Sequence, residues 1–277
     1  EIPLTYHKHG NYLECHYCGY KTYKPAKCPN CNSTDINEFG IGTEKLEEEI
    51  INNFKGVKTI RMDVDTTSRK GSHARIINDF QNKKYNVLIG TQMVAKGLDF
   101  ENVTLVGVIN ADASLNIPDY RSAERTFDLL SQVSGRAGRG KLDGEVILQG
   151  FNMDHYSILA ASIHDYKAFY NKELQIRKKL DYPPYYNLCL IKTSSKDIDA
   201  LNNENDKIIS YLRNKMKDCI ILGPSMASIP RINNAYYMQI IIKYKNIKTI
   251  YDSLIFISRE YQKKKVKLEI DINPYHI

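Results

Sequence analysis

Between Gly56 and Gly150, short runs of apolar residues alternate with longer stretches in which apolar residues recur every three or four positions. The apolar runs indicate buried strands over residues 57–62, 85–90, 103–109 and 145–149. The helical periodicity predicts helices over residues 72–83 and 121–138. Strands separated by helices form parallel sheets covered on both faces, so an α/β domain is expected. Such sheets bind ligands at the carboxyl ends of their strands, which here are the loops after residues 90 and 109.

The pattern changes after Pro184. Strands are predicted over residues 187–193, 220–223, 236–244 and 266–272, with helices over 197–217 and 247–262. The order βαββαβ is that of a split βαβ, ferredoxin-like α+β domain. Between the two patterns, residues 155–180 are predicted to form a helical stretch. Asp181-Tyr182-Pro183-Pro184 ends that stretch, because proline disfavours helix in the residue before it.

Glycine usage separates the same two regions. Fourteen of the fifteen glycines lie in the first 150 residues, and only Gly223 lies in the rest. A chain of 277 residues that is 42% hydrophobic and 26% charged has room for about two globular domains, which excludes collagen-like and largely disordered classes. No apolar run approaches the roughly 18 residues of a membrane span, so no membrane partner is expected. The net charge of +7 is compatible with a polyanionic partner but is common among globular proteins.

Four of the six cysteines form two C-x-x-C pairs, Cys15 with Cys18 and Cys28 with Cys31. Four thiolates at this spacing are typical of a closed structural zinc site. Histidines at positions 7, 9 and 16 could be further ligands, but we interpret them as ordinary surface histidines. The other two cysteines, at positions 189 and 219, lie in apolar stretches and are expected to be inert buried thiols.

Tyrosines and lysines alternate around the cysteine pairs, at positions 17, 20 and 23 and at positions 21, 24 and 27. Aromatic rings can stack on bases while ammonium groups neutralise phosphates. A small zinc module also needs polar residues for solubility. Both interpretations remain open.

The segment over residues 90–100, GTQMVAKGLDF, leaves a predicted strand and enters a loop. Gly97 allows backbone N–H groups to approach an anion, and Thr91 and Lys96 can contact phosphates. Asp99 can accept a hydrogen bond from a ribose hydroxyl or hold an arginine. An ordinary strand-to-helix turn has a similar composition, so this segment alone does not decide between the two.

In QVSGRAGR, residues 132–139, Gln132, Arg136 and Arg139 are spaced i, i+4 and i+7 and share one face of the predicted helix. An arginine directed at a γ-phosphate stabilises the charge that develops during phosphoryl transfer. The alternative is a solvated, arginine-rich helix end favoured by the helix dipole. Two glycines within the predicted helix argue against that alternative, because each costs about 1 kcal/mol.

These two segments resemble motifs V and VI of superfamily 2 helicases. Further segments narrow the resemblance to the bacterial primosomal replication-restart helicases, the PriA family: DTTSRKG (65–71), DYRSAERTFDLL (119–130), the double C-x-x-C region and DYPPY (181–185). The resemblance covers the whole chain. It implies a RecA-like parallel-sheet helicase lobe 2 with a cysteine-rich zinc insertion, followed by a small α+β (βαββαβ) C-terminal domain.

The resemblance also implies roles for individual residues. Arg136, Arg139 and Gln132 would be the catalytic residues of motif VI. Gly97 and Asp99 would face the nucleotide. The residues expected to couple the nucleotide site to the DNA backbone are Thr91, Gln92 and Lys96. The expected domains are a zinc module over 1–38, the helicase lobe over 39–152, a helical linker over 153–185 and the C-terminal domain over 186–277.

Family members use ATP with Mg²⁺, move 3′ to 5′ on single strands, recognise stalled forks and help reload the replicative helicase. The partners implied are branched and single-stranded DNA, primosome proteins and single-strand-binding protein. A monomer in the bacterial cytoplasm, associated with the nucleoid, is expected. The competing interpretation is a non-catalytic, zinc-bearing DNA- or protein-binding adaptor; an RNA-directed helicase would share both motifs.

The chain departs from the family pattern in two ways, which concern the ATP site and the zinc ligands. The chain contains neither a G-x-x-x-x-G-K-[ST] motif nor an Asp-Glu pair, so we expect a C-terminal fragment that is inactive alone because lobe 1 would complete the ATP site. The family carries eight cysteines for two zinc ions, and four of them would precede Glu1. Cys15 with Cys18 and Cys28 with Cys31 would then bind different ions, unlike the single four-thiolate site that the spacing suggests.

Overall fold

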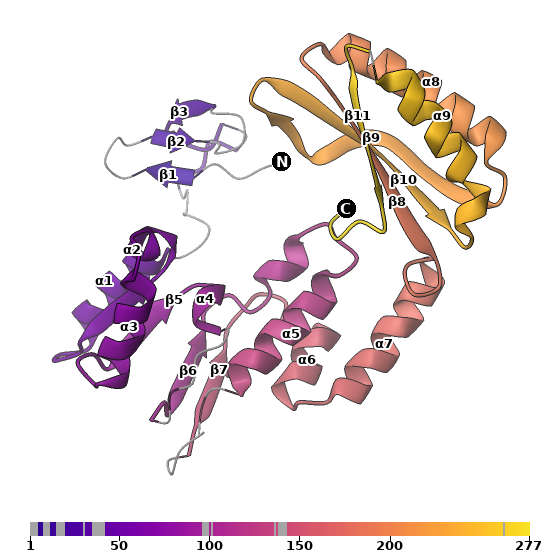
Figure 1. The fold of residues 1–277 in the computed structure, drawn as a ribbon. Helices are drawn as coiled ribbons and strands as arrows, with labels where there is room; N and C mark the ends of the chain where they lie inside the picture. Colours follow the sequence, from indigo (N-terminus) through magenta and orange to yellow (C-terminus); the bar gives the residue numbers. More distant parts are fainter. Residues whose placement is uncertain are drawn as a thin grey trace. The chain divides into compact units, whose positions relative to one another are not determined.

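The computed structural model describes residues 5–7, 12–14, 20–29, 31–34, 42–95, 100, 102–135, 137, 143–262 and 264–277. The chain divides into two compact units, which are described separately (Figure 1). One unit comprises Glu1–Ile36, Pro118–Tyr120 and Leu174–Ile277. The other comprises Asn37–Ile117 and Arg121–Glu173. Within the described ranges, no helix is long and apolar enough to cross a membrane.

The N-terminal region holds a small antiparallel sheet of β1 (Thr5–His7), β2 (Tyr12–Glu14) and β3 (Lys21–Tyr23), in that order. Tyr12 lies opposite Tyr23, and the Lys21 ammonium lies 4.9 Å from the centre of the Tyr12 ring. Each strand has three residues. A sheet this small buries little apolar surface, so it depends on other interactions for stability.

The α/β unit contains two pairs of parallel strands in the described part of the chain. β4 (Thr59–Met62) pairs with β5 (Val87–Gly90), and β6 (Leu105–Val108) pairs with β7 (Glu145–Leu148). The predicted parallel α/β character is therefore confirmed, with strands that are shorter at their ends than predicted.

Helices cover both faces of the β4–β5 pair. α1 (Thr43–Asn53) contacts the face that carries Thr59 and Arg61, because Glu47 bonds to both side chains. α3 (Ser72–Gln81) packs on the other face, where Met62 and Ile76 form a buried cluster. A single turn, α2 (Val64–Thr67), follows β4. The sequence reasoning missed α1, although Leu46, Ile50 and Phe54 recur at helical spacing.

The second part of the same unit has a core between helices. A 3₁₀ turn, η2 (Ala113–Asn116), leads to α5 (Ser122–Ser134), whose Phe127 stacks on Phe169 with ring centres 4.3 Å apart. The helical stretch predicted over residues 155–180 is interrupted: the structure has α6 (Tyr156–Ser162) and α7 (Tyr166–Lys179). The chain turns at His164, which has a φ of 54°, and the Asp165 carboxylate then accepts from the Ala168 N–H at 2.9 Å. Aspartate at this position starts a new helix.

The C-terminal region confirms the predicted βαββαβ order. It consists of β8 (Asn187–Ser195), α8 (Ile198–Lys215), β9 (Cys219–Ile232), β10 (Ala235–Tyr244), the short 3₁₀ helix η3 (Ile247–Thr249), α9 (Tyr251–Tyr261) and β11 (Lys267–Ile272). The antiparallel sheet has the order β11-β8-β10-β9. Both long helices lie on one face of it, over a core that includes Ile191, Ile240 and Ile242 (Figure 1).

β9 is much longer than the strand predicted over residues 220–223. Gly223-Pro224 suggests a strand end, but the strand continues through it to Ile232 with irregular register against β10. Gly223 has a φ of 99°, and a Cβ there would lie 2.8 Å from the Gln239 carbonyl oxygen. Glycine is therefore required at this bend both by its backbone conformation and by the neighbouring strand.

Lys243 of β10 holds the segment that precedes β8 against the sheet face opposite the helices. Its ammonium donates to the Leu180 carbonyl at 2.7 Å and lies 3.7 Å from the centre of the Tyr182 ring. The residue is only 6% exposed, and burial lowers its pKa. The carbonyl and the aromatic ring replace the water that this cation loses on folding.

Glu204 joins α8 to α9. Its carboxylate accepts hydrogen bonds from Lys207 at 2.6 Å, Lys264 at 2.9 Å and Tyr261 at 2.7 Å. These bonds, from Lys207 first and then from Lys264 and Tyr261, lower the pKa of Glu204 to about 2. The ionised carboxylate is therefore the form that fastens the two helices together.

Replacing Glu204 by glutamine is expected to lower the stability of the C-terminal region by about 1 kcal/mol near pH 7. The pKa in the folded state lies below the ordinary value of 4.5, so the stabilisation is complete above that pH and is lost as the pH falls toward 2. Hydrogen exchange of the α8 and α9 amides measures this difference. Glu260→Gln, at an exposed position of α9, is the control and should change stability little. A Glu204→Gln effect that does not shrink on acidification would contradict the assignment.

Candidate site at the carboxyl ends of the parallel strands

The first predicted segment begins where β5 ends. Thr91 and Gln92 are exposed there, at the start of α4 (Gln92–Ala95), and the Val94 N–H donates to the Thr91 carbonyl at 3.0 Å. Gly90 lets this helix start close to β4, because a Cβ on Gly90 would lie 2.6 Å from the Met62 carbonyl oxygen and would overlap the Val94 side chain. Lys96, Gly97 and Asp99 lie outside the described residues.

The second predicted segment begins at the end of α5. Gln132 is exposed in the last turn, while Leu130 is fully buried. The predicted continuation of the helix to residue 138 is wrong: α5 ends at Ser134, Gly135 caps it, and Ala137 lies in a turn. Glycine is a poor helix former and a common helix terminator, which explains the early end. Arg136 and Arg139 lie outside the described residues, so the common helix face expected for them and Gln132 stays a prediction.

A buried carboxylate that the sequence reasoning missed ties the loops after β6 and β7 together. Asp112 is 4% exposed, and its Oδ2 accepts from the backbone N–H groups of Phe151 at 3.0 Å and Asn152 at 2.7 Å. A Cβ on Gly150 would lie 2.7 Å from Oδ1, so glycine is needed beside this carboxylate. Among the residues that the structure describes, Asp112 Oδ1 has no hydrogen-bond partner. Asp112 could have been recognised from the sequence, because it is an acidic residue shortly after a predicted buried strand, at the carboxyl edge of the sheet where ligands are expected to bind.

Asp63, directly after β4, is a structural carboxylate. Its side chain accepts from the Thr43 hydroxyl at 2.7 Å and from the Thr66 N–H at 2.9 Å. The Asp63 N–H in turn donates to the Thr66 hydroxyl at 2.9 Å, which completes a capping box. Burial raises the pKa of Asp63, but these hydrogen bonds outweigh it and lower the pKa overall. The carboxylate thus fixes the turn that opens the DTTSRKG segment.

Of the four candidate zinc ligands, Cys28 and Cys31 lie in the described part of the chain. Cys28 is half-buried and Cys31 exposed, in a turn where the Asn32 N–H donates to the Cys28 carbonyl at 2.9 Å and the Cys28 N–H to the Ser33 carbonyl at 2.8 Å. A tight turn that carries two thiols three positions apart fits one half of a zinc site. Cys15 and Cys18 fall outside the described ranges, within which no group of three or more metal-ligating side chains occurs.

The remaining cysteines have no features of reactive thiols. Cys189 is fully buried, and burial raises its pKa to about 12. Cys219 is half-buried, and burial also raises its pKa. A thiol with a raised pKa is a poor nucleophile and metal ligand, as the apolar surroundings in the sequence suggested.

Comparison with protein families shows three matches in chain order. The PriA DNA helicase Cys-rich region (CRR) domain matches residues 1–22, the helicase conserved C-terminal domain matches residues 31–141, and the primosomal protein N C-terminal domain matches residues 178–275. The relative from Bacillus subtilis, named Replication restart protein PriA, is 47% identical over 99% of this chain. The chain belongs to the PriA family.

Other PriA proteins give the same result. The Synechocystis relative is 40% identical over 100% of the chain, and the Haemophilus influenzae relative is 37% identical over 99% of it. The chain spans only about a third of the curated relatives it matches, at 35%, 34% and 38% of their lengths. The helicase C-terminal match contains both the β5–α4 segment and the end of α5, so Thr91, Gln92 and Gln132 lie within one matched domain.

Proposed function

We propose that this chain is the C-terminal part of an ATP-dependent 3′-to-5′ DNA helicase that recognises stalled forks and restarts replication. The observation that carries the proposal is the succession of a PriA cysteine-rich region, a helicase C-terminal domain and a primosomal C-terminal domain in one chain. Relatives named Replication restart protein PriA match this chain over almost its whole length, which supports a common function.

In this proposal, the helicase lobe spans residues 39–152 and contributes one side of the ATP site. Arg136 and Arg139 contact the γ-phosphate, with Gln132 beside them, while Gly97 and Asp99 face the nucleotide. The exposed position of Gln132 in the last turn of α5 is compatible with this role. ATP with Mg²⁺ supplies the phosphoryl group whose transfer drives movement, and the Mg²⁺ ligands come from lobe 1.

Thr91, Gln92 and Lys96 are the proposed contacts to the DNA backbone. Thr91 and Gln92 are exposed at the carboxyl end of β5, in the strand-to-helix connection where parallel sheets bind ligands. Polar side chains and a lysine in one short segment can donate hydrogen bonds to the phosphate oxygens of a DNA strand. A segment that touches DNA and continues into the nucleotide-facing Gly97 and Asp99 can link hydrolysis to movement along the strand.

Zinc is the proposed structural metal of the module over residues 1–38, with Cys15, Cys18, Cys28 and Cys31 as ligands. The Cys28–Cys31 turn fits such a role, and the small β1–β3 sheet gains stability from a metal. The partners proposed are branched and single-stranded DNA, primosome proteins and single-strand-binding protein. We further propose a monomer that works at the bacterial nucleoid, with a helical linker over 153–185 and a C-terminal domain over 186–277.

The proposed function is tested by ATP hydrolysis and fork unwinding with the purified full-length protein. We expect hydrolysis that single-stranded DNA stimulates and unwinding that requires ATP. The 277-residue chain alone should not hydrolyse ATP, because it contains no phosphate-binding loop motif. A full-length protein that binds forks but neither hydrolyses ATP nor unwinds them would instead be an adaptor. DNA-stimulated hydrolysis by the 277-residue chain would contradict the two-lobe ATP site.

A further inference from the structure

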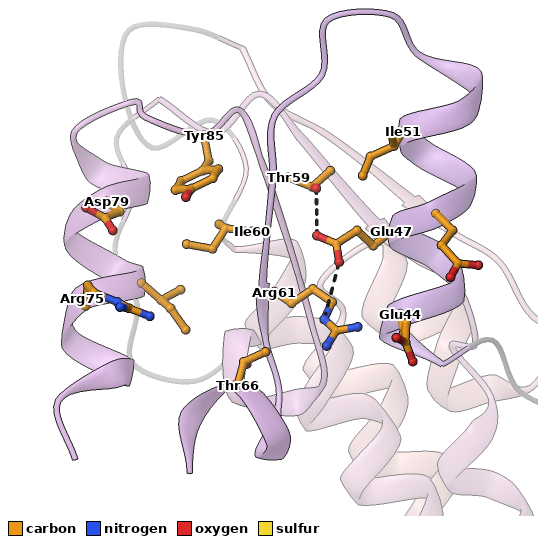
Figure 2. A pocket seen from close by; sticks show the side chains of 12 residues that line it. Glu44, Glu47, Ile51, Thr59, Ile60, Arg61, Thr66, Arg75, Asp79 and Tyr85 are labelled. Atoms are coloured by element: carbon orange, nitrogen blue, oxygen red, sulfur yellow. Dashed lines mark hydrogen bonds and ion pairs between the residues drawn. The ribbon is translucent and has the colours of Figure 1, made fainter. Parts of the chain in front are cut away.

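The outer edge of β4 is flanked by two helices. β4 pairs with β5 along one edge, and in the part of the chain that the structure describes no strand pairs with the other. Because α1 covers one face of β4 and α3 the other, the two helices form the walls of a groove with β4 as its floor (Figure 2). The groove has a volume of about 640 Å³. It lies along the strand and therefore differs from the site at the strand ends.

The backbone of β4 offers hydrogen-bonding groups to this groove. The Val87 N–H of β5 donates to the Lys58 carbonyl at 3.1 Å, and Thr59 is in register with Val87. In a parallel pair, alternate residues direct both N–H and C=O toward the same neighbour. Ile60 therefore bonds to β5, while Thr59 and Arg61 direct their N–H and C=O groups into the groove. Such an edge is a template for one more strand.

The charge of the groove is opposite to that of the chain as a whole. Its walls carry the carboxylates of Glu44, Glu47, Glu48 and Asp79 against the guanidinium groups of Arg61 and Arg75, although the net charge of the chain is +7. Asp79 is already paired with the Lys84 ammonium at 2.6 Å, so the acidic excess lies on α1. The Arg61 Nε lies 3.6 Å from Glu47 and 3.5 Å from Asp63, so carboxylates of this chain already neutralise it. Three of the four groove carboxylates belong to α1 (Figure 2). The α1 wall is acidic, which favours a basic occupant.

The opposite wall is more apolar. Ile60 points to the α3 side, where Ile76 and Tyr85 also line the groove (Figure 2). Side chains alternate between the two faces of a strand. A strand added to β4 would thus direct every second side chain toward the acidic α1 wall and the intervening ones toward this apolar wall.

We propose that the free edge of β4 binds an extended segment of a partner protein in which lysines or arginines alternate with apolar residues. The segment adds to the sheet as a further strand, with backbone hydrogen bonds to Thr59 and Arg61 and ammonium or guanidinium groups along the acidic α1 wall. This site is independent of the proposed helicase activity. A second copy of this chain suits the edge poorly, because edge-to-edge pairing would bring two acidic α1 walls together.

The test uses the intact chain and an acetylated, amidated eight-residue peptide of alternating lysine and valine. Fluorescence anisotropy should show saturable one-site binding, and an alternating glutamate–valine peptide should not bind. Glu44→Lys combined with Glu48→Lys should weaken binding by at least about tenfold. Glu49→Lys, on the same helix but outside the groove, should change it less than about twofold. Circular dichroism checks that both variants keep their helices.

A peptide with N-methyl groups on the edge that faces β4 separates strand addition from simple charge attraction. It carries the same charge but cannot donate to the carbonyls of Thr59 and Arg61, so its binding should be lost. Equal binding of the methylated peptide, or equal weakening by Glu49→Lys, would overturn the proposal. So would absence of binding by the parent peptide. Sedimentation shows whether the chain forms dimers. If it does, and the Glu44 and Glu48 substitutions change this dimerisation, then a second copy is the occupant and the proposal is overturned as well.

Discussion

Replacing Arg139 by alanine in the full-length protein is expected to lower kcat for DNA-stimulated ATP hydrolysis by about 10³-fold. The expectation rests on the proposed function. An arginine at the γ-phosphate stabilises charge that appears only as the phosphoryl group is transferred, so its loss affects the chemical step more than the binding of DNA. Steady-state hydrolysis gives kcat, and fluorescence anisotropy gives the Kd for single-stranded DNA, which should change little.

Arg213→Ala is the matched control for this measurement. Arg213 is an exposed arginine of α8 whose guanidinium lies 3.4 Å from the Gly223 carbonyl, in the C-terminal region. Its replacement should leave kcat unchanged. If Arg139→Ala also left kcat unchanged, Arg139 would have no part in the mechanism. If it abolished DNA binding instead, Arg139 would be a DNA contact rather than a phosphate contact.

Replacing Gly90 by alanine is expected to destabilise the β4–β5 part of the chain by about 3 kcal/mol. The φ of Gly90 is not positive, so alanine can adopt its backbone conformation and the cost is one of space. The new methyl group would lie 2.6 Å from the Met62 carbonyl oxygen and would overlap Val94, so β4 and α4 must move apart. Hydrogen exchange of the β4 and β5 amides measures the loss of stability directly.

Gly107→Ala provides the control within the same unit. Gly107 is also a strand glycine, in β6, but nothing lies within 4 Å of the position where its Cβ would be. Alanine there should leave stability unchanged or raise it slightly, because it restricts the unfolded chain. Equal effects of the two substitutions would show that the close approach at Gly90 does not limit stability.

Most elements of the fold could be predicted from local pattern. The apolar runs at β4 and β5 and the order of elements after Pro184 predicted a parallel α/β domain and a βαββαβ domain, and both are found. The errors lie where a single residue changes the backbone direction. His164 divides one predicted helix into α6 and α7, and Gly135 ends α5 before Arg136. Apolar periodicity does not record such local changes.

The candidate site was only partly predictable. The exposure of Thr91, Gln92 and Gln132 could be predicted, because each lies at the end of an element with an apolar pattern. Asp112 could not be recognised as a tie between two loops, since its partners Phe151 and Asn152 are 39 and 40 positions away. The groove beside β4 was equally hidden, because it depends on which strand lies at the edge of the sheet and on α1, which was not predicted.

The buried ammonium of Lys243 sets where the C-terminal domain can be cut out as an independent piece. A piece that begins at Asn187, the first residue of β8, would lack the Leu180 carbonyl and the Tyr182 ring but would keep the lysine beneath them. Without this segment the ammonium would return to water, and the lysine stem and the sheet face that the segment covers would be exposed. A piece that keeps this packing therefore starts at or before Leu180, close to residue 178, where the primosomal C-terminal family match begins.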